Sequence, residues 1–225
     1  MKVIVMLGAP GAGKGTIADG IKAAKGYVHV STGDMLREAV KKGTTLGREA
    51  ETFMMKGELV PDEIIARIVE ERLDGASSEE VYVFDGFPRT IEQARMLERS
   101  LTRRGGQVDR VFYLDAPREV LIARLAGRRI CRKCGANYHV VNIPPKKDGV
   151  CDACGGELYQ RPDDREETIA NRLEVYARQT EALIAHYQKE GVLVRIRAGG
   201  HRDQTMVDIL AQLELAGSHD RNQRA

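Results

Sequence analysis

Short apolar segments alternate along this chain with longer segments in which apolar residues recur at helical spacing. The continuous apolar run at residues 2–7 is typical of a strand that is buried on both faces. Similar runs recur at 27–30, 81–85, 110–115 and 192–196. Helical patterns lie at 15–25, 34–41, 62–73, 90–102, 118–128 and 166–189. Strands that alternate with helices indicate a parallel sheet covered on both sides, so the sequence predicts a three-layer α/β fold with a five-stranded parallel sheet.

Two segments interrupt this alternation. Residues 31–60 have a helical pattern with several glycines and no strand, and residues 129–162 contain all four cysteines and the Pro144-Pro145 pair. We therefore expect a helical insertion at 31–60 and a small second insertion at 129–162, with the core made of 1–30, 61–128 and 163–216. Residues 217–225 lack apolar periodicity, and we expect this tail to be disordered.

A glycine-rich segment, Gly-Ala-Pro-Gly-Ala-Gly-Lys-Gly-Thr, follows the first apolar run at 8–16 and opens a helix. Such glycines let backbone N–H groups wrap around phosphate oxygens, and the helix N-terminus adds partial positive charge. Lys14 supplies a full charge for the phosphates. The strict phosphate-loop pattern places Ser or Thr directly after the lysine, whereas here Gly15 precedes Thr16. The glycine spacing does not fit the dinucleotide-binding fingerprint, so the segment predicts a P-loop that binds a nucleotide.

The cysteines form two close pairs with the spacing C-x2-C-x16-C-x2-C. This spacing fits a zinc site made of four thiolates. Incidental reduced cysteines and a redox C-x-x-C are the alternatives, and the double pairing around one loop-rich insertion favours the metal. Four protein thiolates leave no open position for a catalytic water. We therefore predict a structural zinc ion held by Cys131, Cys134, Cys151 and Cys154.

The balance of positive and negative charges limits the kinds of binding partner that we expect for this protein. The 225 residues include 35 basic and 33 acidic side chains, for a net charge of +2, and no tryptophan. This balance argues against a general nucleic-acid or membrane-surface binder. The apolar runs are all much shorter than the roughly 20 residues that span a bilayer, and the first is shorter than a signal-peptide core. We expect a cytoplasmic protein, in which reduced cysteines are available to a metal.

Three motifs occur in order along the chain: the glycine-rich segment at 8–16, Ser-Thr-Gly-Asp-Met-Leu-Arg at 31–37, and Asp-Gly-Phe-Pro-Arg-Thr at 85–90. Together they closely resemble the adenylate kinase family, and the resemblance runs from residue 1 to about residue 215. It implies reversible phosphoryl transfer from MgATP to AMP, giving two ADP, by a monomer with a long zinc-bearing lid. It also implies that the lid (129–162) and the AMP-side segment (31–60) close over the substrates and exclude water.

The resemblance also implies roles for individual residues. Gln93 is expected to pair with adenine, and Asp85 to orient the waters around Mg²⁺. Arg37 and Arg89 are expected to bind the AMP phosphate as forks. The implied AMP-binding set is Thr32, Arg37, Glu58, Leu59, Val60, Gly86, Phe87, Pro88, Arg89, Gln93, Arg161 and Arg172. The implied ATP-binding set is Gly11, Ala12, Gly13, Lys14, Gly15, Thr16, Arg124, Arg128, Asn137, Tyr138 and Gly200. The implied catalytic set is Lys14, Asp85, Arg89, Arg128, Arg161 and Arg172.

Two other features concern the end of the lid and the ATP side. We expect Asp163 and Asp164, at the hinge of the lid, to anchor the arginines. Pro162 follows Arg161 where the family often has a basic residue, and Arg-Ala-Gly-Gly at 197–200 replaces the family's usual turn near the ATP adenine.

Two further functions stay open from the sequence alone. A GTP-preferring AMP kinase also has a long lid, and a zinc-knuckle protein could bind nucleic acid and use ATP only as a switch. The weak overall charge and the complete AMP-site motif argue against the zinc-knuckle protein, and the GTP-preferring AMP kinase stays the nearest alternative. Such an enzyme needs no general base because its acceptor is an ionised phosphate oxygen, and none of the five histidines falls in a motif.

Overall fold

The structure is a computed structural model that describes the backbone of residues 1–222 and the side chains of residues 1–215. Its main sheet has five strands in the order β2-β3-β1-β4-β8, and all neighbouring strands are parallel. The strands are β1 (Lys2–Leu7), β2 (Val28–Ser31), β3 (Val81–Asp85), β4 (Gln107–Asp115) and β8 (Leu193–Arg197). The predicted α/β fold with a five-stranded parallel sheet is confirmed.

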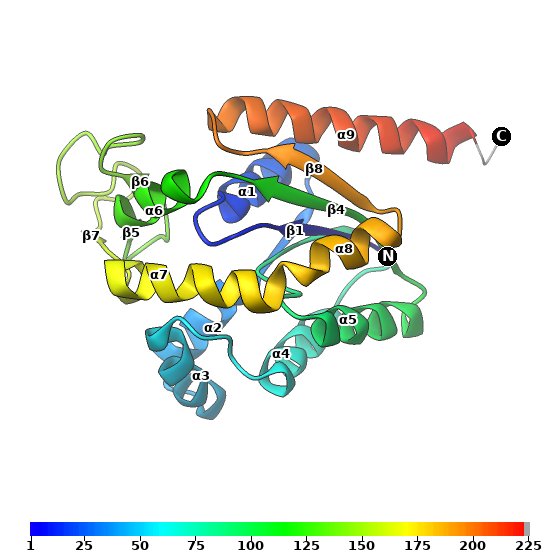
Figure 1. The fold of residues 1–225 in the computed structure, drawn as a ribbon, viewed down its shortest axis with the longest axis horizontal. Coiled ribbons are helices and arrows are strands. Elements are labelled where there is room, and N and C mark those ends of the chain that lie inside the picture. The colour runs from blue at the N-terminus through cyan, green and yellow to red at the C-terminus, as the bar shows by residue number, and fades with distance from the viewer. Residues whose placement is uncertain (223–225) are drawn as a thin grey trace.

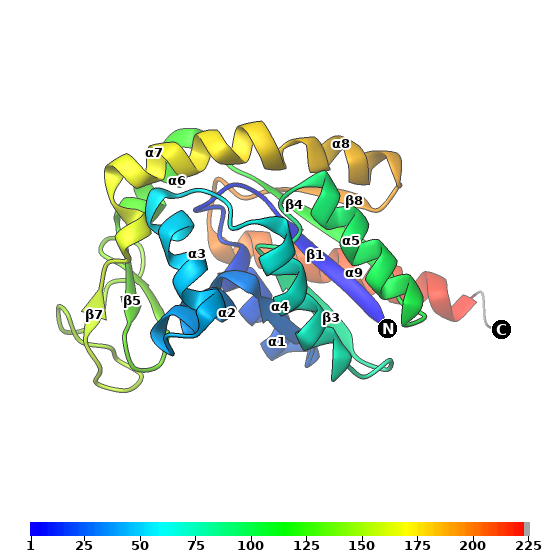
Figure 2. The same cartoon turned by 90° about the horizontal axis from the view of Figure 1, so that it is seen from below.

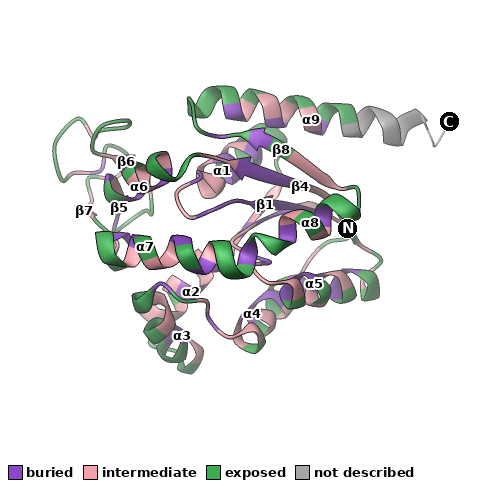
Figure 3. Ribbon diagram, viewed as in Figure 1, coloured by how far each residue is buried: buried purple, intermediate pink, exposed green. Residues whose placement is uncertain are grey.

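Helices cover both faces of this sheet, which explains why the β1 run is apolar throughout (Figures 1 and 3). Val3, Val5 and Leu7 pack on one face and Ile4 and Met6 on the other. The first face is covered by α4 (Asp62–Asp74), α5 (Ile91–Arg103) and α8 (Ala182–Lys189). The second face is covered by α1 (Lys14–Lys25), α6 (Arg118–Ala126) and α9 (Arg202–Asn222).

Both interrupting segments lie at the end of the sheet where β1 leads into the glycine-rich loop (Figure 2). One contains α2 (Thr32–Lys41) and α3 (Thr45–Lys56). The other forms a small antiparallel sheet in the order β6-β5-β7, made of β5 (Arg128–Cys131), β6 (Asn137–His139) and β7 (Leu158–Tyr159). This arrangement places two small substructures around the carboxyl ends of the parallel strands, where α/β folds bind ligands.

Side-chain caps set the starts of the helices around that end. Ser31 Oγ accepts a hydrogen bond from Asp34 N (3.2 Å) at the start of α2, and Thr90 Oγ1 accepts one from Gln93 N (3.1 Å) at the start of α5. Such caps satisfy backbone donors that the first turn leaves free. The motifs at 31–37 and 85–90 therefore each place a helix start beside the end of a strand.

The predicted helix at 166–189 differs from the structure. It consists of α7 (Glu166–Val175), a π-helical stretch (Tyr176–Thr180) and α8. One extra residue in a turn rotates the following helix by about 100°. Ile169 and Leu173 of α7 pack in one core cluster, whereas Leu183 and Tyr187 of α8 pack in the other. The wider π-helical turn therefore lets one long helical segment pack against both hydrophobic core clusters.

Two boundaries also differ from the sequence prediction. The predicted helix 118–128 ends at Ala126, because Arg128 already pairs with His139 in the small sheet. The structure continues α9 to Asn222, into the tail (217–225) for which the sequence predicts disorder. Adding a residue to an existing helix costs little, so polar residues can continue one without apolar periodicity. Residues 223–225 lie outside the described part of the chain. None of the described helices is long and apolar enough to cross a membrane.

Candidate active site

Two adjoining cavities open at the carboxyl ends of the central strands. The larger, of about 790 Å³, runs from the glycine-rich loop to the small sheet, and all residues of the predicted ATP-binding set line it. The smaller, of about 130 Å³, lies between α2, α3 and the loop after β3. Most of the predicted AMP-binding set lines this cavity. The two exceptions are Arg161, which lines the larger cavity, and Phe87, which is buried in the core beside Phe84.

Lys14 begins α1 and lies where the two cavities meet. Its Nζ donates hydrogen bonds to Gly8 O (2.8 Å) and Ala9 O (3.1 Å), so the loop backbone positions the ammonium group. Burial lowers the pKa of Lys14 to about 8, although Asp85 partly offsets this and nearby arginines lower it further. A cation in such a place is stabilised by an anionic ligand.

Glycines give this loop its shape. Gly11 has φ of +86°, and a Cβ there would lie 2.7 Å from Leu121 O. Gly15 stands where the strict pattern has Ser or Thr, and a Cβ on it would lie 3.0 Å from Asp85 Oδ2. The glycine at 15 therefore gives the carboxylate of Asp85 room to approach the start of α1, next to Lys14 and Thr16.

Asp85, at the end of β3, has His29 as a neighbour, and His29 in turn contacts Asp19. His29 Nε2 lies 4.0 Å from Asp85 Oδ2, and His29 Nδ1 lies 2.8 Å from Asp19 Oδ1. Burial alone would lower the pKa of His29, but the hydrogen bond to Asp19 and the charge of Asp85 raise it above its usual value. Both residues line the larger cavity. Neither belongs to a motif, so only the folded chain shows that His29 lies beside Asp85 and that Asp19 contacts His29.

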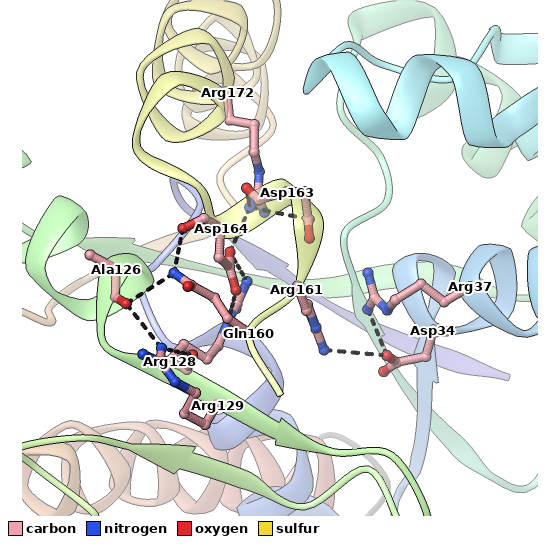
Figure 4. Close-up of polar contacts among 10 residues, drawn as sticks. All are labelled: Asp34, Arg37, Ala126, Arg128, Arg129, Gln160, Arg161, Asp163, Asp164 and Arg172. Carbon is pink, nitrogen blue, oxygen red and sulfur yellow. Dashed lines mark hydrogen bonds and ion pairs between the residues drawn. The ribbon is translucent and has the colours of Figure 1, made fainter. Parts of the chain in front are cut away.

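Two aspartates at the base of the small sheet hold arginines from two elements (Figure 4). Arg128 donates through Nε and Nη2 to the two oxygens of Asp164, at 2.7 and 2.6 Å. Arg172, on α7, donates to Asp164 Oδ1 (3.0 Å) and pairs with Asp163 Oδ2 (3.2 Å). The Asp164 side chain is fully buried. The short turn Pro162–Asp164 thus fixes two guanidinium groups at the edge of the cavities, as expected for these aspartates.

Asp34 links the helical insertion to the small sheet. Its Oδ1 accepts a hydrogen bond from Arg37 Nη2 (2.6 Å) and lies 3.8 Å from Arg161 Nη2 (Figure 4). Burial, with the charges of Arg37 and Arg128, lowers the pKa of Arg161 to about 10. The Nε of Arg161 is buried without a hydrogen-bond partner among the described residues. This guanidinium therefore has an unused donor.

Arg89 lies at the junction of the two cavities and lines both. Its Nε donates to Gly86 O (2.7 Å), which orients the side chain toward both cavities. Burial, followed by the nearby charge of Arg172, lowers its pKa to about 10, so it stays protonated at neutral pH. Buried cations that repel one another are costly without a counter-charge. The junction of the cavities is therefore suited to a ligand with several negative charges.

Gln93 is buried at the wall of the smaller cavity and is already hydrogen-bonded within the protein. Its Oε1 accepts from Arg89 N (2.7 Å), and its Nε2 donates to Asp62 Oδ1 (2.6 Å). No sequence pattern singles out Asp62, because an aspartate at the first position of a helix is already explained as a helix-start residue.

Arg124 and His139 fasten loops around the larger cavity. Arg124 donates to Ala198 O (2.7 Å) and Gly200 O (2.9 Å), which holds the loop between β8 and α9. His139 Nδ1 accepts from Val141 N (3.1 Å) and Asn142 N (3.0 Å), so Nε2 carries the proton and donates to Ala123 O (3.2 Å). His139, which belongs to no sequence motif, joins the small sheet to the end of α6.

The four cysteines converge in the small sheet. Their Sγ atoms all lie within 4.8 Å of one another, with Cys131–Cys154 at 3.4 Å and Cys134–Cys151 at 3.6 Å. Tetrahedral zinc with bonds of about 2.3 Å separates its sulfur ligands by about 3.8 Å. The cluster therefore fits the predicted metal. Tyr138, one of the predicted ATP-side residues, packs in this cluster, with its hydroxyl oxygen 3.4 Å from Cys151 Sγ.

We expect Asp164→Asn to destabilise the protein. The carboxylate accepts three hydrogen bonds from two guanidinium groups, and an amide oxygen can replace only part of them. Removing one partner of a buried ion pair costs about 3–5 kcal/mol, and because both arginines are partly exposed we expect about 2 kcal/mol. Urea unfolding measures the loss. The exposed Glu166→Gln, at the start of α7, is the control; equal stabilities of the two variants would contradict this role of Asp164.

Comparison with known proteins gives concordant matches. The family model described as adenylate kinase matches residues 6–192. A protein from Carboxydothermus hydrogenoformans is 54% identical over 196 residues, which cover 87% of this chain and 91% of the relative. One from Caldicellulosiruptor saccharolyticus is 52% identical over 191 residues, 85% of this chain and 89% of the relative. One from Bacillus licheniformis is 48% identical over 218 residues, 97% of this chain and 99% of the relative. All three relatives are named adenylate kinase.

Proposed function

Because this chain belongs to the adenylate kinase family, we propose that it transfers a phosphoryl group reversibly from MgATP to AMP, giving two ADP. The observation that carries this proposal is the cluster of partly buried cations at the junction of the two cavities. Lys14, Arg89 and Arg172 line both cavities, so a group passing between them stays in contact with the same positive charges. Arg128 joins them from the side of the larger cavity.

The two cavities differ in what lines them, and this supports one nucleotide in each. ATP would occupy the larger cavity, with its phosphates in the glycine-rich loop and its base near Arg124 and the loop at Gly200. AMP would occupy the smaller cavity, which has apolar walls at Leu36, Val60 and Ile65. Arg37 and Arg89, like Lys14, line both cavities. The phosphates of both nucleotides would then meet at the cations.

Positioning and electrostatic stabilisation are sufficient for this chemistry. The acceptor is a phosphate oxygen that is already ionised, so no side chain has to remove a proton. The transferred group carries charge on its three outer oxygens, which Lys14 and the arginines contact through fixed N–H donors. Asp85 would hold Mg²⁺ through its hydration waters, and this ion would neutralise charge on the β- and γ-phosphates. The rest of the electrostatic stabilisation would come from the lysine and arginine side chains of the protein.

Closure of the two insertions would exclude water as a competing acceptor. Arg128, at the start of β5, and Arg161, just after the end of the antiparallel β7, lie at the same end of the small sheet, and Asp34 connects Arg161 to α2. These contacts support a movement of 129–162 and 31–60 toward each other when substrates bind. Both proposed substrate cavities are formed by one chain, and this supports a monomer. We also propose that the protein is cytoplasmic.

Zinc would act on the stability of the lid and not on the reacting atoms. The four thiolates fill a tetrahedral coordination shell, and the cluster packs with Tyr138 and Leu158 in a small separate core. The metal would thereby keep β5 and β6 in register, and with them Arg128 and Asn137 at the cavity wall.

A panel of nucleotides tests the proposed substrates. The purified protein is incubated with Mg²⁺, ATP and AMP, GMP, CMP or UMP in turn, and the diphosphates are separated by chromatography. We expect ADP with AMP and far less product with the others. Replacing ATP with GTP tests the GTP-preferring alternative, which faster turnover with GTP would favour. If no monophosphate is phosphorylated by protein that binds ATP, a nucleotide-switched binding protein becomes the better account, and a salt-titrated RNA-binding assay tests it.

A further inference from the structure

The side-chain amide of Gln93 lies between two partners of opposite character. Asp62 Oδ1 accepts a hydrogen bond from its Nε2 (2.6 Å), and the backbone N–H of Arg89 donates to its Oε1 (2.7 Å). In the reversed orientation, Oε1 would face a carboxylate and the NH₂ group would face an N–H. Both contacts would be repulsive in a buried site, where an unsatisfied polar group is costly. The amide therefore has one allowed orientation.

Asp62 is itself held in place. Its Oδ2 accepts a hydrogen bond from Thr90 Oγ1 (3.0 Å), and that same oxygen of Thr90 accepts from Gln93 N (3.1 Å). Asp62 begins α4, whereas Thr90 and Gln93 belong to the start of α5. The three residues thus form a closed ring of hydrogen bonds between two helices, which includes the backbone N–H of Gln93, and both carboxylate oxygens of Asp62 have a fixed donor.

Each atom of the Gln93 amide has capacity for one more hydrogen bond, because an amide oxygen accepts two and an NH₂ group donates two. Gln93 lines the smaller cavity. Toward a ligand it offers one N–H donor and one oxygen acceptor in a fixed order. A 6-aminopurine presents an acceptor at N1 and a donor at its amino group, which match this pair. A 6-oxopurine presents a donor at N1–H and an acceptor at O6, so it needs the reversed amide.

We propose that Asp62 is a positioning residue that fixes the orientation of Gln93 and so makes the monophosphate site select 6-aminopurines over 6-oxopurines. This inference rests on the proposed function, because it takes the smaller cavity as the AMP site. Asp62 does not line that cavity and acts only through Gln93. Discrimination of this kind does not depend on size, since IMP differs from AMP only at position 6 and in the N1 proton.

Asp62→Asn tests the inference with a side chain of the same shape. An asparagine amide can turn its NH₂ group toward the oxygen of a reversed Gln93. The repulsion at position 62 then disappears, and only the repulsion at the backbone N–H of Arg89 remains. We expect the ratio of kcat/KM for AMP to that for IMP to fall by about tenfold or more, with most of the change in KM. The control is Glu63→Gln, which removes a negative charge from the next, exposed residue in the same turn of α4. This variant should keep the wild-type ratio.

A double-mutant cycle shows whether Asp62 acts through Gln93. Gln93→Leu removes the amide, and Asp62→Asn added to it should leave the AMP to IMP ratio where Gln93→Leu alone puts it. A purely structural role would lower turnover with both monophosphates equally and leave the ratio unchanged in Asp62→Asn. That result would overturn the inference.

The affinities of each variant for AMP and for IMP, measured by calorimetry, separate the role of Asp62 from the proposed kinase function. If the wild type fails to phosphorylate AMP, the proposed function fails, and the binding ratio still decides the role of Asp62. A tenfold fall in that ratio in Asp62→Asn alone would support the inference, and an unchanged ratio would contradict it.

Discussion

Arg89→Ala is expected to lower kcat by about 10³-fold or more, the scale on which arginines stabilise transferring phosphoryl groups elsewhere. Arg89 lines both cavities, its Nε is held by Gly86 O, and its guanidinium lies in a cluster with Lys14 and Arg172. Its removal takes a positive charge and the N–H donors of both Nη groups from the position where the phosphates of both nucleotides would meet. Steady-state kinetics with saturating ATP and AMP measures the loss.

Two further variants make this test specific. Arg89→Lys keeps the charge but loses the planar fork, so we expect it to recover only part of the rate. Arg95→Ala removes an exposed arginine from the outer side of the same helix, α5, and should leave kcat within about twofold. If Arg89→Ala kept a tenth or more of the wild-type kcat, the assignment of the cation cluster as the reaction centre would be wrong.

Loss of the metal is expected to unfold the lid while the core stays folded. The lid has few buried apolar residues of its own, and they pack around the cysteine cluster. Zinc binding contributes about 10–16 kcal/mol to the folding of zinc-finger peptides, so a lid of this size depends on it. The variant Cys131→Ser/Cys151→Ser should lose about one zinc per chain, lose hydrogen-exchange protection over 129–162, and show a raised KM for ATP.

The control for this experiment is Lys133→Ala, which changes an exposed residue between two of the cysteines. It should keep both the metal and the protection. Protection of the central strands should stay unchanged in both variants, because the two main core clusters are separate from that of the lid. If the cysteine variant retained zinc content and lid protection, the structural zinc site would be refuted.

Local patterns were enough to predict the fold. β1 has apolar side chains on both faces, and the sequence shows this as an unbroken apolar run. The π-helical stretch was not predictable, because it depends on which core cluster each half of the long helix meets. The same holds for the end of the predicted helix at 118–128, which stops where Arg128 pairs with His139 of β6, a pairing that forms only in the folded small sheet.

In the candidate site, too, some residues could be predicted from the sequence and others could not. Glycines, Lys14 and the paired cysteines have spacings that indicate their chemistry directly, and the structure brings each set together. Asp62 and His139 form hydrogen bonds with residues that lie 31 and 16 positions away in the sequence. An aspartate at a helix start and a histidine in a short strand are both common, so neither residue draws attention in the sequence. Their contribution follows only from the hydrogen bonds of the folded chain.

Transfer of labelled phosphate tests the central claim most directly. The protein is mixed with Mg²⁺ and ATP carrying ³²P in its γ-phosphate, with and without AMP, and the labelled products are separated. Direct transfer between the two cavities predicts that the label appears in ADP only when AMP is present, with little inorganic phosphate in either reaction. Label that appears as inorganic phosphate at the same rate with or without AMP would contradict the account, because water and not AMP would then be the acceptor.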